Sequence, residues 1–257
     1  MLENVGIIIQ ARMGSTRLPG KILKQIEGKS ILEHVVERCK VSNANKIIIA
    51  TSKNKENDII EKLCKEKNYS YFRGSEEDVL GRYYECSKQF ELESIVRITS
   101  DCPLVDPETI NKGLIKFELD KLDYLGNAHE RSFPRGLDVE IFNFGSLKKA
   151  YEMAKEKSSR EHVTLFIYSN PSIFKIGSLL AEGKLKRPDI RLTVDTPEDL
   201  NLIKIIYKEL YHGKPIPIKK VMNFLEKNPK ISEINKESEK GQMDKNKKEN
   251  IGQEFLK

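Results

Sequence analysis

The strongest constraint on the fold is the alternation of short Val- and Ile-rich runs with segments of helical periodicity. This alternation is typical of βαβ units, in which parallel strands form a central sheet and the intervening helices cover its faces. We therefore predict an α/β fold on a mainly parallel sheet. Strands are expected at 5–9, 46–51, 69–72, 94–99, 137–142 and 190–194, and helices at 30–39, 56–66, 78–90, 144–155, 160–168, 197–211 and after Pro107.

The chain of 257 residues is long enough for one large domain. We assign residues 1–228 to that domain. From Pro229 the composition changes to Lys, Glu, Asn, Gln and Ser, which leaves too few apolar side chains to bury and predicts a disordered charged tail over 229–257. The irregular segment 123–142 is a candidate for sugar binding or for the contact of a homodimer.

Bulk properties exclude several classes of protein. No run approaches the roughly 20 apolar residues of a membrane span, and no signal-peptide pattern is visible, so we expect a cytoplasmic protein without a membrane partner. The four cysteines lack CxxC spacing, which predicts reduced packing residues and neither a zinc site nor disulfides. The net charge of +6 comes from lysines interleaved with acids, a pattern of solvated helix faces that does not indicate nucleic-acid binding.

The segment QARMGSTRLPGK at 10–21 directly follows the first predicted strand. Ligands of open α/β sheets bind beyond the carboxyl ends of strands, so a ligand is expected at this loop. Gly14 and Gly20 permit a close approach of backbone amides to an anion. Arg12, Arg17 and Lys21 add three cations, and together these features predict a site for a triphosphate.

Two common phosphate motifs do not fit this loop. A P-loop has four residues between its glycines and Ser or Thr after the lysine, whereas five residues separate Gly14 from Gly20 here and Ile22 follows Lys21. The GxGxxG pattern of dinucleotide enzymes is also absent. The alternative to a triphosphate site is a basic surface turn formed by Pro19 and Gly20.

The same loop resembles the ARxxSxRLPGK signature of the cytidylyltransferases that activate 3-deoxy-manno-octulosonate and acylneuraminates. The resemblance is greatest to their spore coat polysaccharide biosynthesis protein F branch and covers about the first 225 residues. Further matching motifs, in the same order, are GSEEDVL at 74–80, SDCPL at 100–104, RGLDVE at 135–140, REHV at 160–163 and VDTPEDL at 194–200.

This resemblance implies a three-layer αβα Rossmann-like nucleotidyltransferase fold, the fold of the nucleotide-diphospho-sugar transferases. It also implies CTP as co-substrate, Mg²⁺ as cofactor, and transfer of CMP to a sugar, which we expect to be acidic. Catalytic roles fall on Arg12, Lys21 and Asp101. The nucleotide is expected to bind at Ala11, Arg12, Gly14, Ser15, Arg17, Lys21, Gly74, Asp78 and Val79, although Asp78 equally fits the start of a helix.

Two aspartates are the expected metal ligands. Asp101 follows the strand at 94–99 and Asp195 follows the strand at 190–194, so both should lie at the edge of the sheet that carries the basic loop. Magnesium is normally held by one or two carboxylates together with phosphate oxygens and water. The alternatives are a turn role for Asp101 and a helix-capping role for Asp195, although Thr196 already fits the N-cap position.

Four residues are candidates for binding the sugar. Asp138 and Glu140 alternate on one strand and share a face, where they contact sugar hydroxyls or a metal unless that face is simply exposed. Arg135 suits a substrate carboxylate or is an exposed loop arginine. His162 contacts an anion, assists deprotonation or is structural, whereas Glu161 fits a capping box that begins at Ser158.

Two rival functions remain open at this stage. A glycosyltransferase that uses nucleotide sugars would place Asp138 and Glu140 at its metal, but it needs no triphosphate loop. A catalytically silent nucleotide- or sugar-binding module has no need for the strand-end aspartates. Release of pyrophosphate separates both rivals from a cytidylyltransferase.

Overall fold

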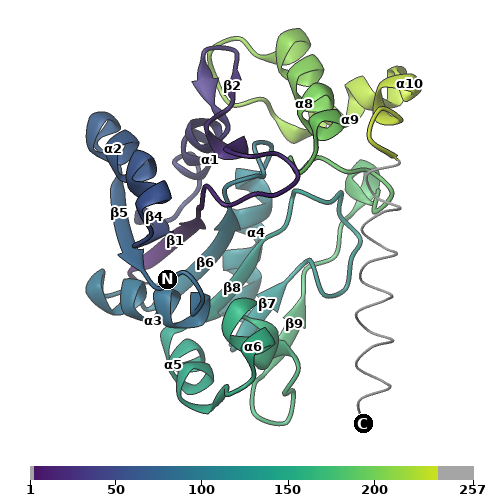
Figure 1. Cartoon of the computed structure of the whole chain (residues 1–257). Coiled ribbons are helices and arrows are strands. Elements are labelled where there is room, and N and C mark those ends of the chain that lie inside the picture. Colours follow the sequence, from purple (N-terminus) through teal and green to yellow (C-terminus); the bar gives the residue numbers. More distant parts are fainter. Residues whose placement is uncertain (1–2, 237–257) are drawn as a thin grey trace, which may run out of the picture.

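A computed structural model describes residues 3–236 of the chain. Its centre is a seven-stranded sheet with the strand order β5-β4-β1-β6-β8-β7-β9, and a small β2-β3 hairpin follows the first loop (Figure 1). The strands are β1 (Val5–Gln10), β2 (Gln25–Ile26), β3 (Lys29–Ser30), β4 (Lys46–Ser52), β5 (Ser70–Gly74), β6 (Ser94–Thr99), β7 (Tyr124–Gly126), β8 (Glu140–Asn143) and β9 (Ile176–Ser178).

The sheet is mainly parallel, as predicted. β1 pairs in parallel with β4 and β6, β4 pairs in parallel with β5, and β7 pairs in parallel with β9. Only β8 runs in the opposite direction, antiparallel to both β6 and β7. The reversal places the start of β8 beside the end of β6, at the edge of the sheet where the first loop lies.

Helices cover both faces of this sheet and confirm the three-layer α/β arrangement. The α-helices are α1 (Ile31–Cys39), α2 (Asp58–Lys67), α3 (Val79–Gln89), α4 (Pro107–Leu119), α5 (Phe144–Met153), α6 (Lys157–Glu161), α7 (Leu165–Tyr168), α8 (Pro197–Leu210), α9 (Ile218–Lys227) and α10 (Pro229–Ser232). Short 3-10 helices are η1 (Lys21–Leu23), η2 (Lys55–Asn57) and η3 (Gly183–Leu185).

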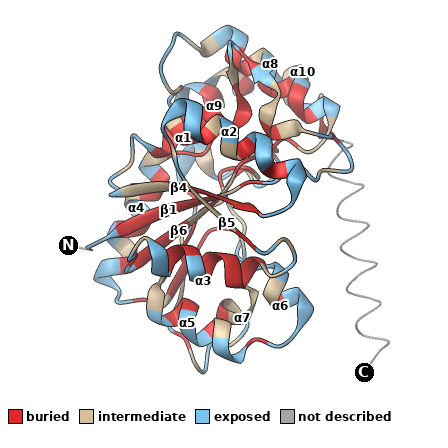
Figure 2. Cartoon of the chain, turned by 60° about the vertical axis from the view of Figure 1, so that its left-hand side comes forward, coloured by how far each residue is buried: buried red, intermediate tan, exposed pale blue. Residues whose placement is uncertain are grey.

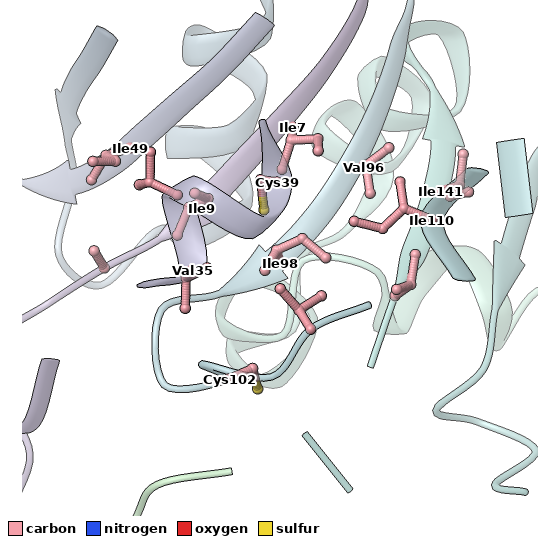
Figure 3. Close-up of a cluster of buried hydrophobic side chains, with 14 of the residues drawn as sticks. Ile7, Ile9, Val35, Cys39, Ile49, Val96, Ile98, Cys102, Ile110 and Ile141 are labelled. Carbon is pink, nitrogen blue, oxygen red and sulfur yellow. The ribbon is translucent and has the colours of Figure 1, made fainter. Parts of the chain in front are cut away.

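Alternate residues of the central strands supply two separate cores. Ile7 and Ile9 of β1 pack with Val35 of α1 on one face (Figure 3). Ile8, between them in sequence, packs with Tyr83 of α3 on the other face. Because side chains of a strand point alternately to opposite faces, an unbroken apolar run forms a strand that is buried on both sides. Figure 2 shows the resulting band of buried residues along the central strands and α3.

In a third apolar cluster, α8 and α9 pack against the segment 190–194, which precedes α8. These helices lie with α10 at one end of the molecule (Figure 1). Ile190, Leu192 and Val194 are buried in this cluster. The predicted strand over 190–194 is therefore wrong: its apolar residues face α8, and its ladder pairing is limited to one isolated bridge between Arg135 and Arg191.

The predicted helix over 160–168 is also wrong in detail. The structure has two short helices, α6 and α7, separated at 162–164. Val163 between them has a φ of 50°, a left-handed conformation that cannot continue a right-handed helix. The N-cap of α6 is Glu156 without a side-chain cap, so the capping box predicted for Ser158 and Glu161 is not formed.

The chain stays ordered beyond the predicted boundary at 228. Pro229–Ser232 form α10, and the buried Asn235 donates to the carbonyl oxygen of Arg191 at 3.1 Å. The charged segment predicted over 229–257 thus begins too early, and its remainder, 237–257, lies outside the described residues. Ile231 of this segment packs against the apolar cluster of α8 and α9, so 229–236 is held by both apolar packing and hydrogen bonds.

Two expectations from composition can be compared with the structure. All four cysteines are free and buried, which confirms their role as packing residues. Over residues 3–236, none of the helices combines the length and the apolar character that crossing a bilayer requires.

Candidate active site

The loop that follows β1 is held by hydrogen bonds from two of its backbone amides, one to β4 and one to η2. The amide of Ala11 donates to the carbonyl oxygen of Ala50 at 3.0 Å, and the amide of Met13 donates to Oδ1 of Asn57 at 2.8 Å. At the far end of the loop, Gly20 has a φ of 64°, which glycine adopts without strain and which turns the chain into η1. Lys21 is consequently the first residue of a helical turn and lies close to the sheet.

Lys21 bridges the two aspartates that were predicted to hold metal. Its Nζ lies 2.6 Å from Oδ2 of Asp101 and 2.7 Å from Oδ1 of Asp195. Arg17 approaches the same oxygen of Asp195 at 3.2 Å. The structure thus places the basic loop beside both Asp101 and Asp195, although Asp195 does not follow a strand.

Backbone hydrogen bonds bring the two aspartates together although 94 positions separate them in the sequence. Asp101 follows β6, and the amide of Ser100 donates to the carbonyl oxygen of Gln10 in β1 at 3.0 Å. The amide of Val194 donates to the carbonyl oxygen of Asp101 at 2.8 Å. Because Asp195 is the next residue, its side chain starts from a backbone that is tied directly to that of Asp101.

The buried ion pair of Arg191 with Asp199 holds Asp195 in position. Arg191 donates to Oδ2 of Asp195 at 2.5 Å and to the two carboxylate oxygens of Asp199 at 2.9 and 3.1 Å. Asp199 also accepts from the amides of Asp195 and Thr196 and from Asn235. As predicted, Thr196 is the N-cap of α8, and it forms a capping box with Asp199.

Charge–charge interactions keep Lys21 and Asp195 ionised. Burial raises the pKa of Asp195, but Lys21, Arg17 and Arg191 outweigh burial and hold the pKa below the ordinary value of 3.8. Burial lowers the pKa of Lys21, but Asp101 and Asp195 outweigh it and raise the pKa above 10.5. At neutral pH Lys21 is therefore an ammonium group and Asp195 a carboxylate.

A cleft of about 300 Å³ opens above these charged groups. Its walls come from the first loop, from the residues that follow β6, and from Asp195. The residues that line it are Gln10, Arg12, Gly14, Ser15, Thr16, Arg17, Lys21, Ile22, Thr99, Ser100, Asp101 and Asp195. Seven of these, namely Arg12, Gly14, Ser15, Arg17, Lys21, Asp101 and Asp195, belong to the nucleotide, catalytic or metal set predicted from the sequence.

The donor set of the cleft fits a divalent cation such as Mg²⁺. Magnesium takes oxygen ligands and is usually bound by one or two carboxylates plus substrate phosphates. Asp101 and Asp195 supply two carboxylates that already share one cation, the ammonium of Lys21. Within residues 3–236, no group of three or more metal-ligating side chains is present, so phosphate or water oxygens would have to complete the coordination.

The other predicted nucleotide residues do not line this cleft. Ala11 and Val79 are buried in the two cores of the sheet. Asp78 caps α3 by accepting from the amide of Gly81 at 2.9 Å, and it pairs with Arg160. Gly74 is packed against the side chain of Arg82. The structure thus supports the helix-start interpretation of Asp78.

The predicted sugar residues lie in different surroundings. Asp138 accepts from Arg131 at 2.8 Å, and Arg135 lies in a loop whose backbone bonds to Ile190 and Leu192. His162 is exposed at the C-cap of α6. None of these three lines the cleft.

Glu140 is the clearest departure from the predicted sugar site. Its residue is only 6% exposed, and its carboxylate pairs with Arg97 and accepts from Tyr124 and Thr164. Burial raises the pKa of Glu140, but Arg97 and the hydrogen bonds outweigh burial and leave the pKa below 4.5. Its partners occupy the oxygens that were expected to contact a sugar or a metal.

Sequence reasoning missed several residues of the cleft and its support. Gln10 and Thr99 are the last residues of β1 and β6, so their strand-end positions offered the same signal that identified Asp101. Arg191, Asp199 and Asn235 offered no such signal, because their importance arises from a contact with Asp195 that the fold creates.

Comparison with known proteins points to one family. The sequence profile of the family described as Cytidylyltransferase matches residues 6–235. The chain is 42% identical to an uncharacterized protein of Methanocaldococcus jannaschii, covering 89% of this chain and 93% of that protein. It is 34% identical to the spore coat polysaccharide biosynthesis protein SpsF of Bacillus subtilis, covering 89% and 96%.

A solved structure is similar over the same length. The structure of a cytidylyltransferase from Leptospira borgpetersenii superposes with a TM-score of 0.84 at 34% identity, covering 89% of this chain and 96% of that one. The family match over residues 6–235 includes the basic loop, both aspartates and α10. The chain is a nucleotidyltransferase that belongs to the cytidylyltransferase family.

Proposed function

We propose that this enzyme transfers CMP from CTP to a hydroxyl group of an acidic sugar, for use in a surface polysaccharide or glycan, and releases pyrophosphate. The observation that carries the proposal is the bridge from Lys21 to Asp101 and Asp195 beneath a basic loop. Family membership supports CTP as the nucleotide, and the name of the Bacillus subtilis relative supports a polysaccharide precursor as the product.

The chain's own residues have separate tasks in this reaction. Arg12, Arg17 and Lys21 bind oxygens of the triphosphate and offset its charge. Asp101 and Asp195 would hold Mg²⁺, which would neutralise phosphate oxygens and polarise the α-phosphorus. Cleft residues orient the sugar hydroxyl toward that phosphorus.

The chemical step is a single displacement. A bond forms between the sugar hydroxyl oxygen and the α-phosphorus, and the bond from that phosphorus to the oxygen bridging the β-phosphate breaks. The hydroxyl proton passes to solvent, and pyrophosphate leaves with the electron pair of the broken bond. The proposal requires no covalent protein intermediate, so positioning and charge neutralisation account for the catalysis.

Further parts of the proposal concern the setting of the reaction. Four free, buried cysteines suit a reducing compartment, which supports the cytoplasmic location expected from the sequence. A homodimer through 123–142 also stays a proposal. Most of this segment is buried within its own chain, and His129 and Glu130 are its exposed residues available to a partner.

The test is pyrophosphate release with Mg²⁺, each of the four nucleoside triphosphates and a panel containing 3-deoxy-manno-octulosonate, N-acetylneuraminate and neutral hexoses. We expect release with CTP and an acidic sugar. Lys21→Ala and Asp101→Asn should each reduce turnover at least about a hundredfold without unfolding the protein. Lys24→Ala, a lysine of the same segment outside the cleft, is the matched control. Nucleotide binding without release for any sugar would favour a silent binding module.

A further inference from the structure

Gln10 lines the cleft, but unlike Lys21 and Asp101 it has no charge. It is the last residue of β1, and its backbone carbonyl accepts from the amide of Ser100. Its side-chain Oε1 accepts from Nη2 of Arg97 at 3.3 Å. The residue therefore joins the catalytic cleft to a buried polar network on the neighbouring strand.

The buried polar network holds Arg97 rigidly. Nη1 of Arg97 pairs with Oε2 of Glu140, whose other oxygen accepts from Tyr124 at 2.7 Å and from Thr164 at 2.5 Å. Arg97 and Glu140 are also directly opposite each other in the ladder between β6 and β8. The side chains of Arg97 and Glu140 are 17% and 9% exposed, so neither has room to change partners freely.

This contact determines which end of the Gln10 carboxamide faces the cleft. A guanidinium group has only donors, so Gln10 must turn its oxygen toward Arg97. The NH₂ group then points away from Arg97, and within residues 3–236 it donates no hydrogen bond to protein. Gln10 lines the cleft, and its NH₂ group is the part of the side chain that is left to donate to a ligand.

The position of Gln10 indicates which substrate meets this donor. Among the cations of the first loop, Lys21 and Arg17 lie at Asp101 and Asp195 in the middle of the cleft. Arg12 lies farther out on the side of β4 and β5, where it pairs with Glu76. The side chain of Gln10 instead points toward β6 and β8, because it accepts from Arg97 of β6, which lies opposite Glu140 of β8. A triphosphate held between Lys21 and Arg12 fills the cleft from its middle toward β4, which leaves the side of β8 for the sugar.

We propose that Gln10 is a specificity-determining residue whose NH₂ donates to an oxygen of the acceptor sugar, and that Arg97 is the positioning residue that sets its orientation. This inference rests on the proposed function, because it requires a sugar in the cleft. It reassigns Glu140 from sugar ligand to a residue that holds Arg97.

The primary test is Gln10→Met, which keeps the length of the side chain and removes the donor. We expect the KM for the sugar to rise about three- to tenfold, as for the loss of one hydrogen bond. The Kd of CTP, measured by calorimetry without sugar, should change less than about twofold. Gln89→Met, the same change at an exposed position on α3, should alter neither constant.

The role of Arg97 is tested with Arg97→Lys, which keeps a cation beside Glu140 but loses the planar fork that reaches Gln10. We expect the same rise in the sugar KM with an unchanged Kd for CTP. The double variant Gln10→Met with Arg97→Lys should be no worse than Gln10→Met alone, because the two residues act through one contact. A merely structural Arg97 would instead lower stability and impair both substrates.

The outcomes separate this inference from the function on which it rests. If the wild-type enzyme releases no pyrophosphate with any sugar of the panel, the proposed function fails and the inference falls with it. If the wild type is active but Gln10→Met leaves the sugar KM unchanged, only the inference is wrong. A Kd for CTP that rises tenfold would also overturn it, since Gln10 would then contact the nucleotide.

Discussion

Replacing Arg191 with methionine should destabilise the whole enzyme, because this side chain neutralises a carboxylate that has no access to water. The exposed fractions of the paired side chains are 2% for Arg191 and 0% for Asp199. Arg191→Met removes three charge-assisted hydrogen bonds, at 2.9 and 3.1 Å to Asp199 and at 2.5 Å to Asp195. The thioether fills much of the same space but leaves Asp199 without its cation.

The size of the effect follows from that burial. Removing one partner of a buried ion pair typically costs about 3–5 kcal/mol, because the remaining charge is desolvated and unpaired. The remaining donors to Asp199, which are the amides of Asp195 and Thr196 and the side chain of Asn235, favour the lower part of this range. For a chain of this size each kcal/mol lowers Tm by about 2–4 °C, so we expect a fall of about 6–20 °C.

Arg187→Met is the matched control. Arg187 pairs with Asp189 through two hydrogen bonds of 2.8 and 2.7 Å, but the two side chains are 42% and 57% exposed. An exposed pair contributes at most about 1 kcal/mol. Denaturant unfolding of both variants measures the difference. If Arg191→Met loses less than about 1 kcal/mol, or no more than Arg187→Met, burial does not govern these pairs and the reasoning is wrong.

Two further predictions concern the support of the site. Gly136→Ala should lower the free energy of unfolding by about 2 kcal/mol or more, because φ of Gly136 is 100° and a Cβ would lie 2.5 Å from the backbone nitrogen of Thr193. Gly213→Ala is the control: φ of Gly213 is 79° but the space around it is open, so this variant should lose only about 1 kcal/mol in the same unfolding assay. Glu140→Gln should be less stable than the wild type at pH 7. Burial raises the pKa of Glu140, but Arg97 outweighs burial and leaves this pKa lowered. The stability that the carboxylate contributes is lost as pH falls through the lowered pKa, so the difference between variant and wild type should shrink below about pH 4.5. A deficit that is constant between pH 7 and pH 3 would contradict the ionised pairing of Glu140.

The sequence predicts the sheet best for strands whose apolar residues point to both faces. The runs at 5–9 and 46–51 are mostly apolar on both faces, and only the centre of a covered sheet accommodates such a run. The run at 190–194 has the same character, but its residues are buried against α8. Periodicity reports that a segment is buried and does not report which neighbour buries it.

The candidate site divides in the same way. Arg12, Lys21 and Asp101 were predictable because each directly follows a strand or lies in a recognisable loop. The pairing of Glu140 with Arg97 was not, since it spans 43 positions and depends on the antiparallel direction of β8. Asp138 and Glu140 alternate in sequence as expected, yet one pairs with Arg131 at the surface and the other is buried.

The contact between Asn235 and Asp199 sets the C-terminal limit for a shortened form of this enzyme. By composition alone, a truncated protein for crystallisation or fusion would stop at residue 228. Such a truncation removes α10 together with the side chain that donates to Asp199 at 2.8 Å. Asp199 fixes Arg191, and Arg191 in turn holds Asp195 beside Lys21. A shortened chain should therefore keep residues up to 236, since the last described turn belongs to the support of the cleft.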